Sequence, residues 1–129
     1  MPVRYRVDTA LGVVFAEASG PVRDEDLLDY ARKMAGDPQL RSGLRELIDL
    51  RGADLRAITS EAVREVAAIF AAHDSTSPTG RIAIVAPADS SYGLSRMYQA
   101  YREPAPVDLR VFREIGEARA WLGLPEDEA

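Results

Sequence analysis

Seven polar residues form two groups that could together bind an anion or another small polar molecule. Each group follows one of two predicted strands: Asp49, Arg51 and Asp54, then Asp89, Ser90, Ser91 and Tyr92. Carboxyl ends of parallel strands meet at one edge of a sheet, so both groups are expected on one polar rim, with Arg51 as counter-charge. The alternative is structural: Asp89 or Ser90 caps the following helix, while Asp49 and Arg51 form an ion pair. The sequence favours this alternative, because folds of this kind collect polar caps at that edge.

Thr59 and Ser60 carry two adjacent hydroxyls where an amphipathic helix is predicted to start. A phosphate on either residue would be stabilised at a helix N-terminus, so both are candidate phosphorylation sites. The simpler interpretation is that Thr59 caps the helix by accepting a backbone hydrogen bond, with Glu61 favoured by the helix dipole.

The sequence has few of the residues that catalytic sites and metal sites require. The chain has one histidine, His73, and no cysteine, which excludes histidine pairs, cysteine metal sites, disulfides and thiol catalysis. A catalytic triad in the run "HDSTS" fails on geometry, because adjacent residues cannot supply three convergent side chains. The carboxylates lie mostly in first helical turns and near the C-terminus, and no pair suits acid/base catalysis. We therefore expect no catalytic residue, metal or cofactor, and a protein that is not an enzyme.

The strands and helices that must position these residues can be predicted from the spacing of apolar residues along the sequence. Alternating apolar residues or short apolar runs predict strands, and apolar residues at i, i+3 and i+4 predict helices. The expected strands are 3–8, 13–19, 44–50, 82–87 and 107–111, and the expected helices are 23–36, 59–72, 89–103 and 115–124. This order predicts one α/β domain, 1–124, whose five-stranded sheet is parallel apart from the first strand, followed by an acidic tail, 125–129.

Two helices carry further expectations about burial. In the third helix, Leu94, Met97, Tyr98 and Tyr101 form an apolar stripe. Arg96, Gln99 and Arg102 are then expected to face outward and offer a second binding surface. In the last helix, Trp121 is expected to be substantially buried.

The composition limits the classes of partner. A net charge of −5 argues against non-specific nucleic-acid binding. No apolar run approaches the roughly 20 residues that span a bilayer. The N-terminal "MPVRYRVDTA" shows a strand pattern and no signal-peptide pattern, so a cytoplasmic location is expected.

The element order, with "YGLSRMYQAY" after the fourth strand and "VFREIGEARAWL" near the end, resembles the STAS or SpoIIAA-like superfamily. The similarity is to a broad bacterial branch of small STAS-like proteins, and it implies a β/α superhelix laid down in chain order. The anti-sigma-factor antagonists of this superfamily carry an Asp-Ser-(Ser/Thr)-Gly-Leu motif at the corresponding helix start. Here "LRAITSEAV" has Ala57 or Ile58 in place of the acid and Glu61 or Ala62 in place of the glycine. The resemblance therefore implies that the scaffold is retained and the phosphorylation switch is lost.

Two functions remain open. The first is a non-enzymatic regulatory module that binds another protein or itself. The second is a carrier or sensor of a small ligand, such as a lipid or an anion, by analogy with STAS-like and CRAL-TRIO domains. A ligand-binding domain should contain a sizeable apolar pocket beneath the third helix with a few convergent polar groups, whereas an interaction module should have a filled core and an exposed apolar patch. An apolar strip on the thinly covered sheet face, or the Arg96–Arg102 side of the third helix, leads us to expect a homodimer. The alternative is a monomer whose termini and loops cover the strip.

Overall fold

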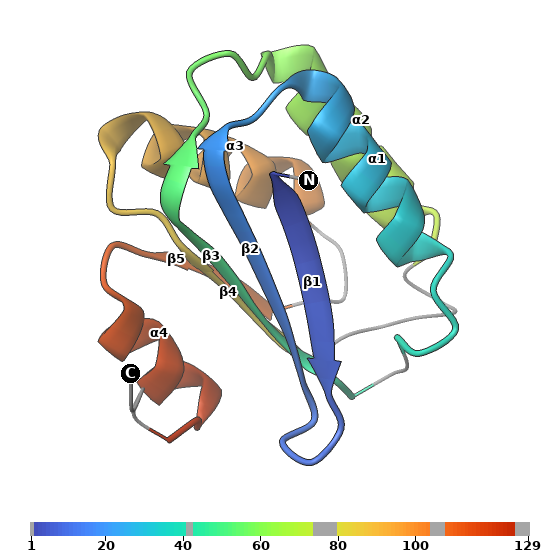
Figure 1. The fold of residues 1–129 in the computed structure, drawn as a ribbon, viewed down its shortest axis with the longest axis vertical. Coiled ribbons are helices and arrows are strands. Elements are labelled where there is room, and N and C mark those ends of the chain that lie inside the picture. The colour runs from blue at the N-terminus through green and yellow to red at the C-terminus, as the bar shows by residue number, and fades with distance from the viewer. Residues whose placement is uncertain (1, 41–42, 74–79, 104–107, 126–129) are drawn as a thin grey trace.

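The computed structural model describes residues 2–40, 43–73, 80–103 and 108–125. In these ranges the chain forms a mixed sheet with helices on both faces (Figure 1). In chain order, the elements are β1 (Val3–Asp8), β2 (Val13–Pro21), α1 (Asp24–Ala35), β3 (Arg45–Asp54), α2 (Ser60–Ala71), β4 (Arg81–Val85), α3 (Asp89–Arg102), β5 (Asp108–Phe112) and α4 (Ile115–Leu122).

The sheet follows the order of the chain. Its strand order is β1-β2-β3-β4-β5. Strand β1 pairs with β2 in an antiparallel hairpin, and each later strand pairs in parallel with the strand before it. The prediction of five strands, parallel apart from the first, with four helices is confirmed. Val107 and residues 126–129, which belong to the predicted last strand and the acidic tail, lie outside the described residues.

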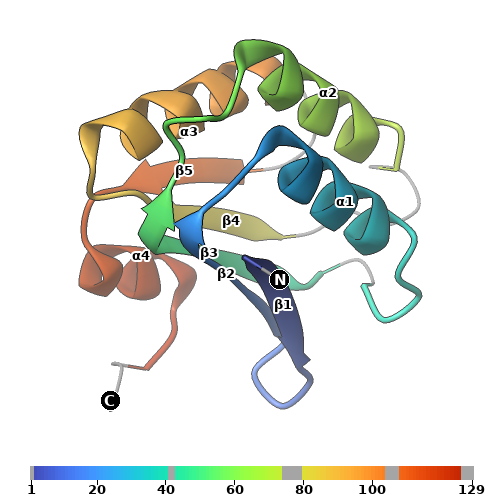
Figure 2. The same cartoon turned by 45° about the horizontal axis from the view of Figure 1, so that its top comes forward.

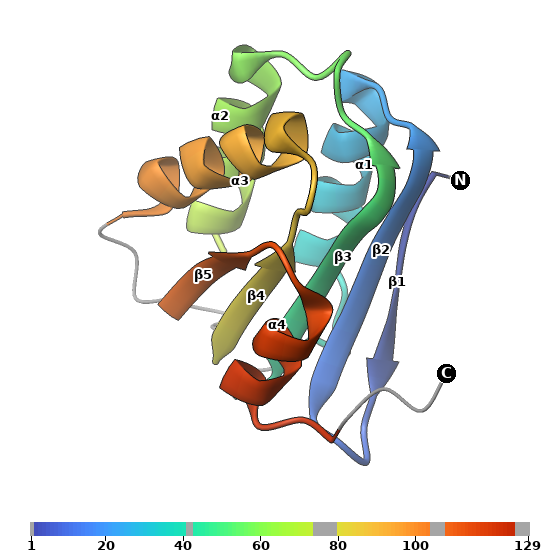
Figure 3. The ribbon, with the colours of Figure 1, turned by 90° about the vertical axis from the view of Figure 1, so that its left-hand side faces the viewer.

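Three helices form one layer and the fourth lies alone on the other side of the sheet. Helices α1, α2 and α3 cover one face, and α4 packs against the opposite face over β3, β4 and β5 (Figures 2 and 3). The apolar run of β4 explains both contacts, because successive side chains of a strand point to opposite faces. Ile82 and Ile84 belong to the cluster under α3, whereas Ala83 and Val85 pack with α4.

Strand β3 is longer than predicted. The expected strand 44–50 ends where the polar residues begin, but β3 continues to Asp54 because β2 is also long. Ser19, Gly20 and Pro21 pair with the extra residues of β3 after an irregularity between Glu17 and Ser19. Arg51 is therefore part of a strand and does not belong to a loop.

The closing helix is anchored by arginine as well as by apolar contacts. Ala118 and Leu122 are buried, as expected, but Trp121 is only partly buried. Its ring packs against Phe112 and lies beneath two guanidinium groups, with the Arg81 and Arg110 carbons 5.0 and 5.2 Å from the ring centroid. Trp121 therefore packs on the buried cluster beneath α4, as expected, and arginine side chains cover the part of its ring that the apolar residues leave open.

No helix within the described ranges is both long enough and apolar enough to cross a bilayer.

Candidate functional site

A cavity lies between the sheet and the three-helix layer. Its volume is about 140 Å³, and its wall is mainly aliphatic and aromatic. Residues of α1, β3, α2, β4 and α3 contribute to its wall. The apolar part of the wall includes Leu27, Met34, Ile48, Leu50, Ile58, Val63, Val66, Phe70, Ile82, Ile84 and Leu94. The ligand-binding hypothesis predicted a sizeable apolar pocket beneath the third helix, and this cavity agrees in place and lining but is small.

A few polar side chains converge on this apolar wall. Glu46 enters it from β3 and is 6% exposed, and Arg102 enters it from the end of α3 and is 5% exposed. The Tyr30 hydroxyl of α1 donates a hydrogen bond to Glu46 Oε2 at 3.3 Å. Ser95 and Tyr98 of α3 and His73, which follows α2, also line the cavity. An apolar pocket with a small number of placed polar groups is the usual form of a small-molecule site.

The carboxyl of Glu46 has a strongly altered pKa. Burial raises the pKa of its carboxyl to about 7, although the Tyr30 hydrogen bond and the charge of Arg102 both act to lower the pKa. Desolvation dominates because a carboxylate loses far more hydration than one long hydrogen bond returns. Burial, with the nearby carboxylate of Glu46, also raises the pKa of Tyr30 well above its ordinary value. Near neutral pH, Glu46 is therefore close to half protonated.

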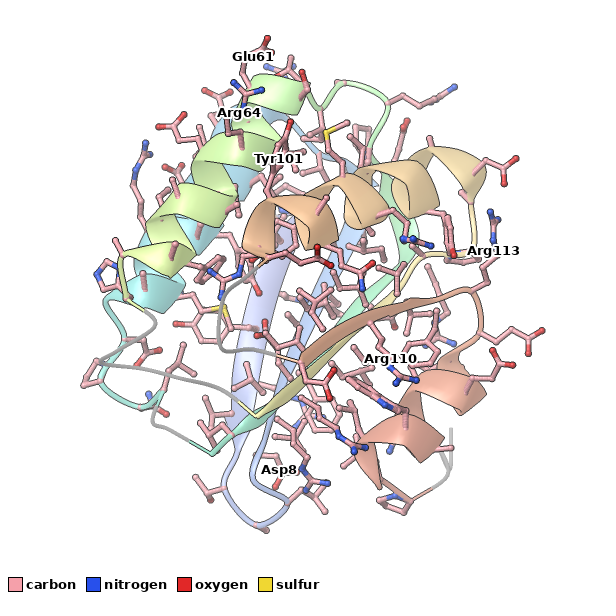
Figure 4. All side chains as sticks on the ribbon, turned by 180° about the vertical axis from the view of Figure 1, so that it is seen from behind. Asp8, Glu61, Arg64, Tyr101, Arg110 and Arg113 are labelled. Carbon is pink, nitrogen blue, oxygen red and sulfur yellow. The ribbon has the colours of Figure 1, made fainter. Side chains whose placement is uncertain are left out.

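Helix α3 packs Leu94, Met97 and Tyr98 against the core, as the sequence predicted, but its last turn differs from the prediction. Arg102 was expected to face outward, but it lies in the cavity wall with Ser95 and Tyr98, and Ser91 is fully buried. Tyr101, expected in the buried stripe, is 37% exposed. Its ring lies beside Arg64 of α2 on the outer surface, with the guanidinium carbon 5.5 Å from the ring centroid (Figure 4). Arg96 is exposed, as expected, but the prediction is wrong for Arg102, and Gln99 is partly buried and donates to the Leu109 carbonyl at 2.8 Å.

Glu46 was not singled out by the sequence analysis, although a signal was present. In "LRELIDL", Glu46 shares its period-2 face with Ile48 and Leu50, which predicts a carboxyl on the helix-covered side. A charged residue on such a face marks either a strand end or a buried polar site. For Arg102 the corresponding signal was its spacing of four residues from Tyr98, which continues the buried stripe.

Asp49 and Arg51 lie on the opposite side of the sheet from the cavity. They form an ion pair with each other, with 2.9 Å between Arg51 Nη2 and Asp49 Oδ2, as the structural alternative predicted. Although burial acts to raise the pKa of Asp49, its hydrogen bonds with Arg51 lower it overall. Asp54 pairs in the same way with Arg56, which lowers the pKa of Asp54 to about 2.

The second predicted group lies at the start of α3 and gathers around Arg113. Arg113 Nη1 donates to Asp89 Oδ1 at 2.9 Å, and the guanidinium carbon lies 4.1 Å from the centre of the Tyr92 ring. Ser91 donates to the Ala88 carbonyl, Ser90 is exposed, and no side chain caps this helix. The seven residues expected on one rim thus divide between separate clusters, each with its own arginine, and Arg113 was missed.

Thr59 is the N-cap of α2, as the simpler interpretation predicted. Its Oγ1 accepts a hydrogen bond from the Ala62 N–H at 3.2 Å. The same hydroxyl donates to Asp24 Oδ2 at 2.7 Å, and the Thr59 N–H donates to Asp24 Oδ1 at 2.9 Å. A phosphate on Thr59 would face the Asp24 carboxylate, which is an unfavourable position for added negative charge. Ser60 is exposed, and its phosphorylation remains an untested prediction.

The other sheet face holds a groove of about 610 Å³ between α4 and the first strands. An exposed apolar strip was expected here, but charged side chains cover the apolar residues. The Arg6 guanidinium lies 4.5 Å from the Phe15 ring centroid, and Arg4 pairs with Glu17 at 2.6 Å. Among the described residues, Tyr101 is the only large hydrophobic side chain classed as exposed. This sheet face therefore does not provide the exposed apolar strip from which the homodimer was predicted. The homodimer itself remains an untested prediction.

No metal centre is visible in the described ranges, where no three potential acidic or histidine ligands lie together. His73 Nδ1 lies 2.9 Å from the Ile69 carbonyl, at the end of α2. Residues 74–77 of the run "HDSTS" lie outside the described ranges. His73 therefore serves here as part of the cavity wall.

Comparison with known proteins identifies the fold. The structure is similar to the crystal structure of an uncharacterised protein of the DUF3478 family with a SpoIIAA-like fold from Shewanella loihica PV-4. The TM-score is 0.56 at 16% sequence identity, and the match covers 93% of each chain. No family model matches this sequence, and no curated protein matches it. The chain thus has the STAS-like fold that the sequence resemblance implied.

Proposed function

We propose that this STAS-like domain is a non-enzymatic carrier or sensor that binds one small, mainly apolar ligand in the cavity under α1, α2 and α3. The observation that supports the proposal is the cavity itself, because protein interiors are normally packed without voids larger than a water molecule. The apolar wall offers dispersion contacts on several sides, so a ligand of matching shape gains contact energy there.

The size of the cavity limits the ligand. An engineered apolar cavity of about 150 Å³ in another protein binds benzene, and the volume here is about 140 Å³. Drug-sized ligands occupy pockets of roughly 300–1,000 Å³. The lipid that the sequence analysis considered would therefore have to be a short one, and a compact ring or branched chain fits better.

A regulatory or protein-interaction role was the first expectation from the sequence. It predicted a filled core and an exposed apolar patch, and the cavity and the arginine-covered sheet face favour the ligand hypothesis instead. The interaction role remains a prediction, and signalling by a ligand-bound domain would be compatible with it.

Titration with toluene, followed by amide chemical shifts, tests the proposal. We expect saturable shifts at residues of the wall, such as Ile48, Val66 and Ile84. Ser95→Leu should fill the cavity and abolish these shifts, whereas Ser90→Leu, which adds the same side chain at an exposed site of the same helix, should leave them unchanged. Absence of saturable binding, or equal binding in the two variants, would refute the proposal.

A further inference from the structure

We propose that the natural ligand is a small monocarboxylic acid with a compact apolar body, bound as the carboxylate beside Arg102 with Glu46 in its protonated form. This inference rests on the proposed function, because it specifies the class of ligand for the same cavity.

Arg102 gives the cavity a fixed positive charge. A guanidinium remains protonated in proteins, and this one lies in the wall at 5% exposure. Coulombic interactions are stronger in such a partly desolvated site than in water. An anion is therefore attracted to the cavity and a cation is repelled. The planar fork of an arginine also matches the two oxygens of a carboxylate.

Glu46 decides whether this attraction is available. As a carboxylate it would repel a second carboxylate in the same small space, but its pKa of about 7 means that protonation near neutral pH requires little free energy. The protonated carboxyl can donate a hydrogen bond to the bound acid. A cationic ligand would suit an ionised Glu46, yet it would have to lie near Arg102, whose charge already acts on Glu46.

Tyr30, the residue that is hydrogen-bonded to Glu46, does not replace it as the proton acceptor. Tyr30 from α1 donates a hydrogen bond to it, and the pKa of Tyr30 is raised further from the neutral range. Tyr98 from α3 and His73 after α2 complete the titratable groups of the described wall. The neighbouring strands place apolar Val14 and Ile82 opposite Glu46 in the sheet.

The first experiment compares single-ring probes of nearly equal size and different charge: benzoate, benzamide and benzylamine, with toluene as the purely apolar reference. Affinities are measured by amide chemical shifts at pH 6. Hydrogen bonds to charged groups are stronger than neutral ones, so we expect benzoate to bind about tenfold more tightly than benzamide, and benzylamine to bind least.

The outcomes separate the two proposals. Toluene binding together with benzamide or benzylamine binding at least as tight as benzoate overturns the carboxylate inference and leaves the cavity function intact. Failure of all four probes overturns both.

The second experiment tests the proton. If only the protonated Glu46 form accepts the acid, benzoate affinity should be constant below pH 7 and fall about tenfold per pH unit above it. Calorimetry at pH 8 in buffers with different ionisation enthalpies should show uptake of close to one proton per benzoate. Glu46→Gln should bind benzoate with the same affinity at pH 6 and pH 8. A pH dependence that persists in Glu46→Gln, or binding without proton uptake, would overturn the inference.

The third experiment removes the cation. Arg102→Leu should weaken benzoate binding about tenfold and leave toluene binding unchanged, and Arg96→Leu, at an exposed position of the same helix, is the matched control. Equal benzoate affinity in the two variants would overturn the role of Arg102. If Arg102→Leu does not fold, the proton measurements on the unmodified protein and on Glu46→Gln still decide the question.

Discussion

Replacing Glu46 with glutamine should change how the stability of the protein depends on pH. The pKa of Glu46 is raised from an ordinary value of 4.5 to about 7 by burial. Between these two values the folded state binds a proton that the unfolded state has released. The stability that the protonated carboxyl provides is therefore fully present below pH 4.5, and it is lost as the pH rises to about 7.

The size of the effect follows from the two pKa values. At about 1.4 kcal/mol per pH unit, the interval from 4.5 to about 7 corresponds to about 3 kcal/mol. Glutamine has nearly the same shape, can accept the Tyr30 hydrogen bond and does not titrate. The variant should thus lack this loss and gain up to about 3 kcal/mol relative to the parent between pH 5 and pH 8.

Urea unfolding of both proteins at half-unit steps from pH 4.5 to pH 8.5 measures this difference. With an m-value of about 1–3 kcal/mol per M, the relative midpoint should move by about 1–3 M over the range. Because the comparison is between pH values, any constant effect of the amide cancels. Glu117→Gln, at an exposed site on α4, should follow the parent curve. Parallel curves for the parent and Glu46→Gln would show that Glu46 is not held at a raised pKa.

Three further measurements test other parts of the structure. Thr59→Ala should cost about 1 kcal/mol of unfolding free energy, since it removes the cap of α2 and the bond to Asp24, whereas Ser60→Ala and Ser60→Asp should be nearly neutral; equal losses at both positions in urea unfolding would contradict the cap assignment. Trp121→Ala should cost about 2–3 kcal/mol, less than the roughly 3–5 kcal/mol of a fully buried aromatic, and a near-normal melting temperature would show that α4 contributes little. Light scattering at micromolar concentration tests the homodimer: a mass of twice 14.1 kDa supports it, and a mass near 14.1 kDa removes it.

The fold could be predicted from the sequence because the local patterns of apolar residues are consistent with a sheet whose strands follow the order of the chain. Strand and helix periods are unbroken over most elements, and each parallel crossover has the length of one helix, which leaves few arrangements of the sheet. The end of β3 was missed because it depends on pairing with the long β2, which a local pattern does not report. The helix cap at Thr59 was predicted correctly because it depends on neighbours in sequence.

The cavity residues were harder to predict because their burial depends on several elements. On α3, residues 94, 97, 98 and 101 and residues 91, 95, 98 and 102 are both acceptable helical stripes. Residue type favours the first set, since tyrosine is more often buried than arginine. Leu94, Met97 and Tyr98 of the first set pack against the core as predicted. The structure also buries Arg102 in place of Tyr101, because the space beneath α3 contains Glu46 from β3, whose carboxyl interacts with the charge of Arg102. Such a choice requires knowledge of which strand lies below the helix.

The chain-order arrangement of the sheet has a consequence for how the protein folds and unfolds. Each strand pairs with its predecessor, so each pairing closes a loop of only one crossover, and strand addition can proceed from the β1–β2 hairpin without long-range closure. The cavity wall extends from Leu27 to Arg102, so it is complete only after α3 has packed, late in such a sequence. If α3 packs after the folding transition state, a ligand held there stabilises contacts that the transition state lacks. Bound ligand should therefore slow unfolding, while the rate of refolding stays unchanged.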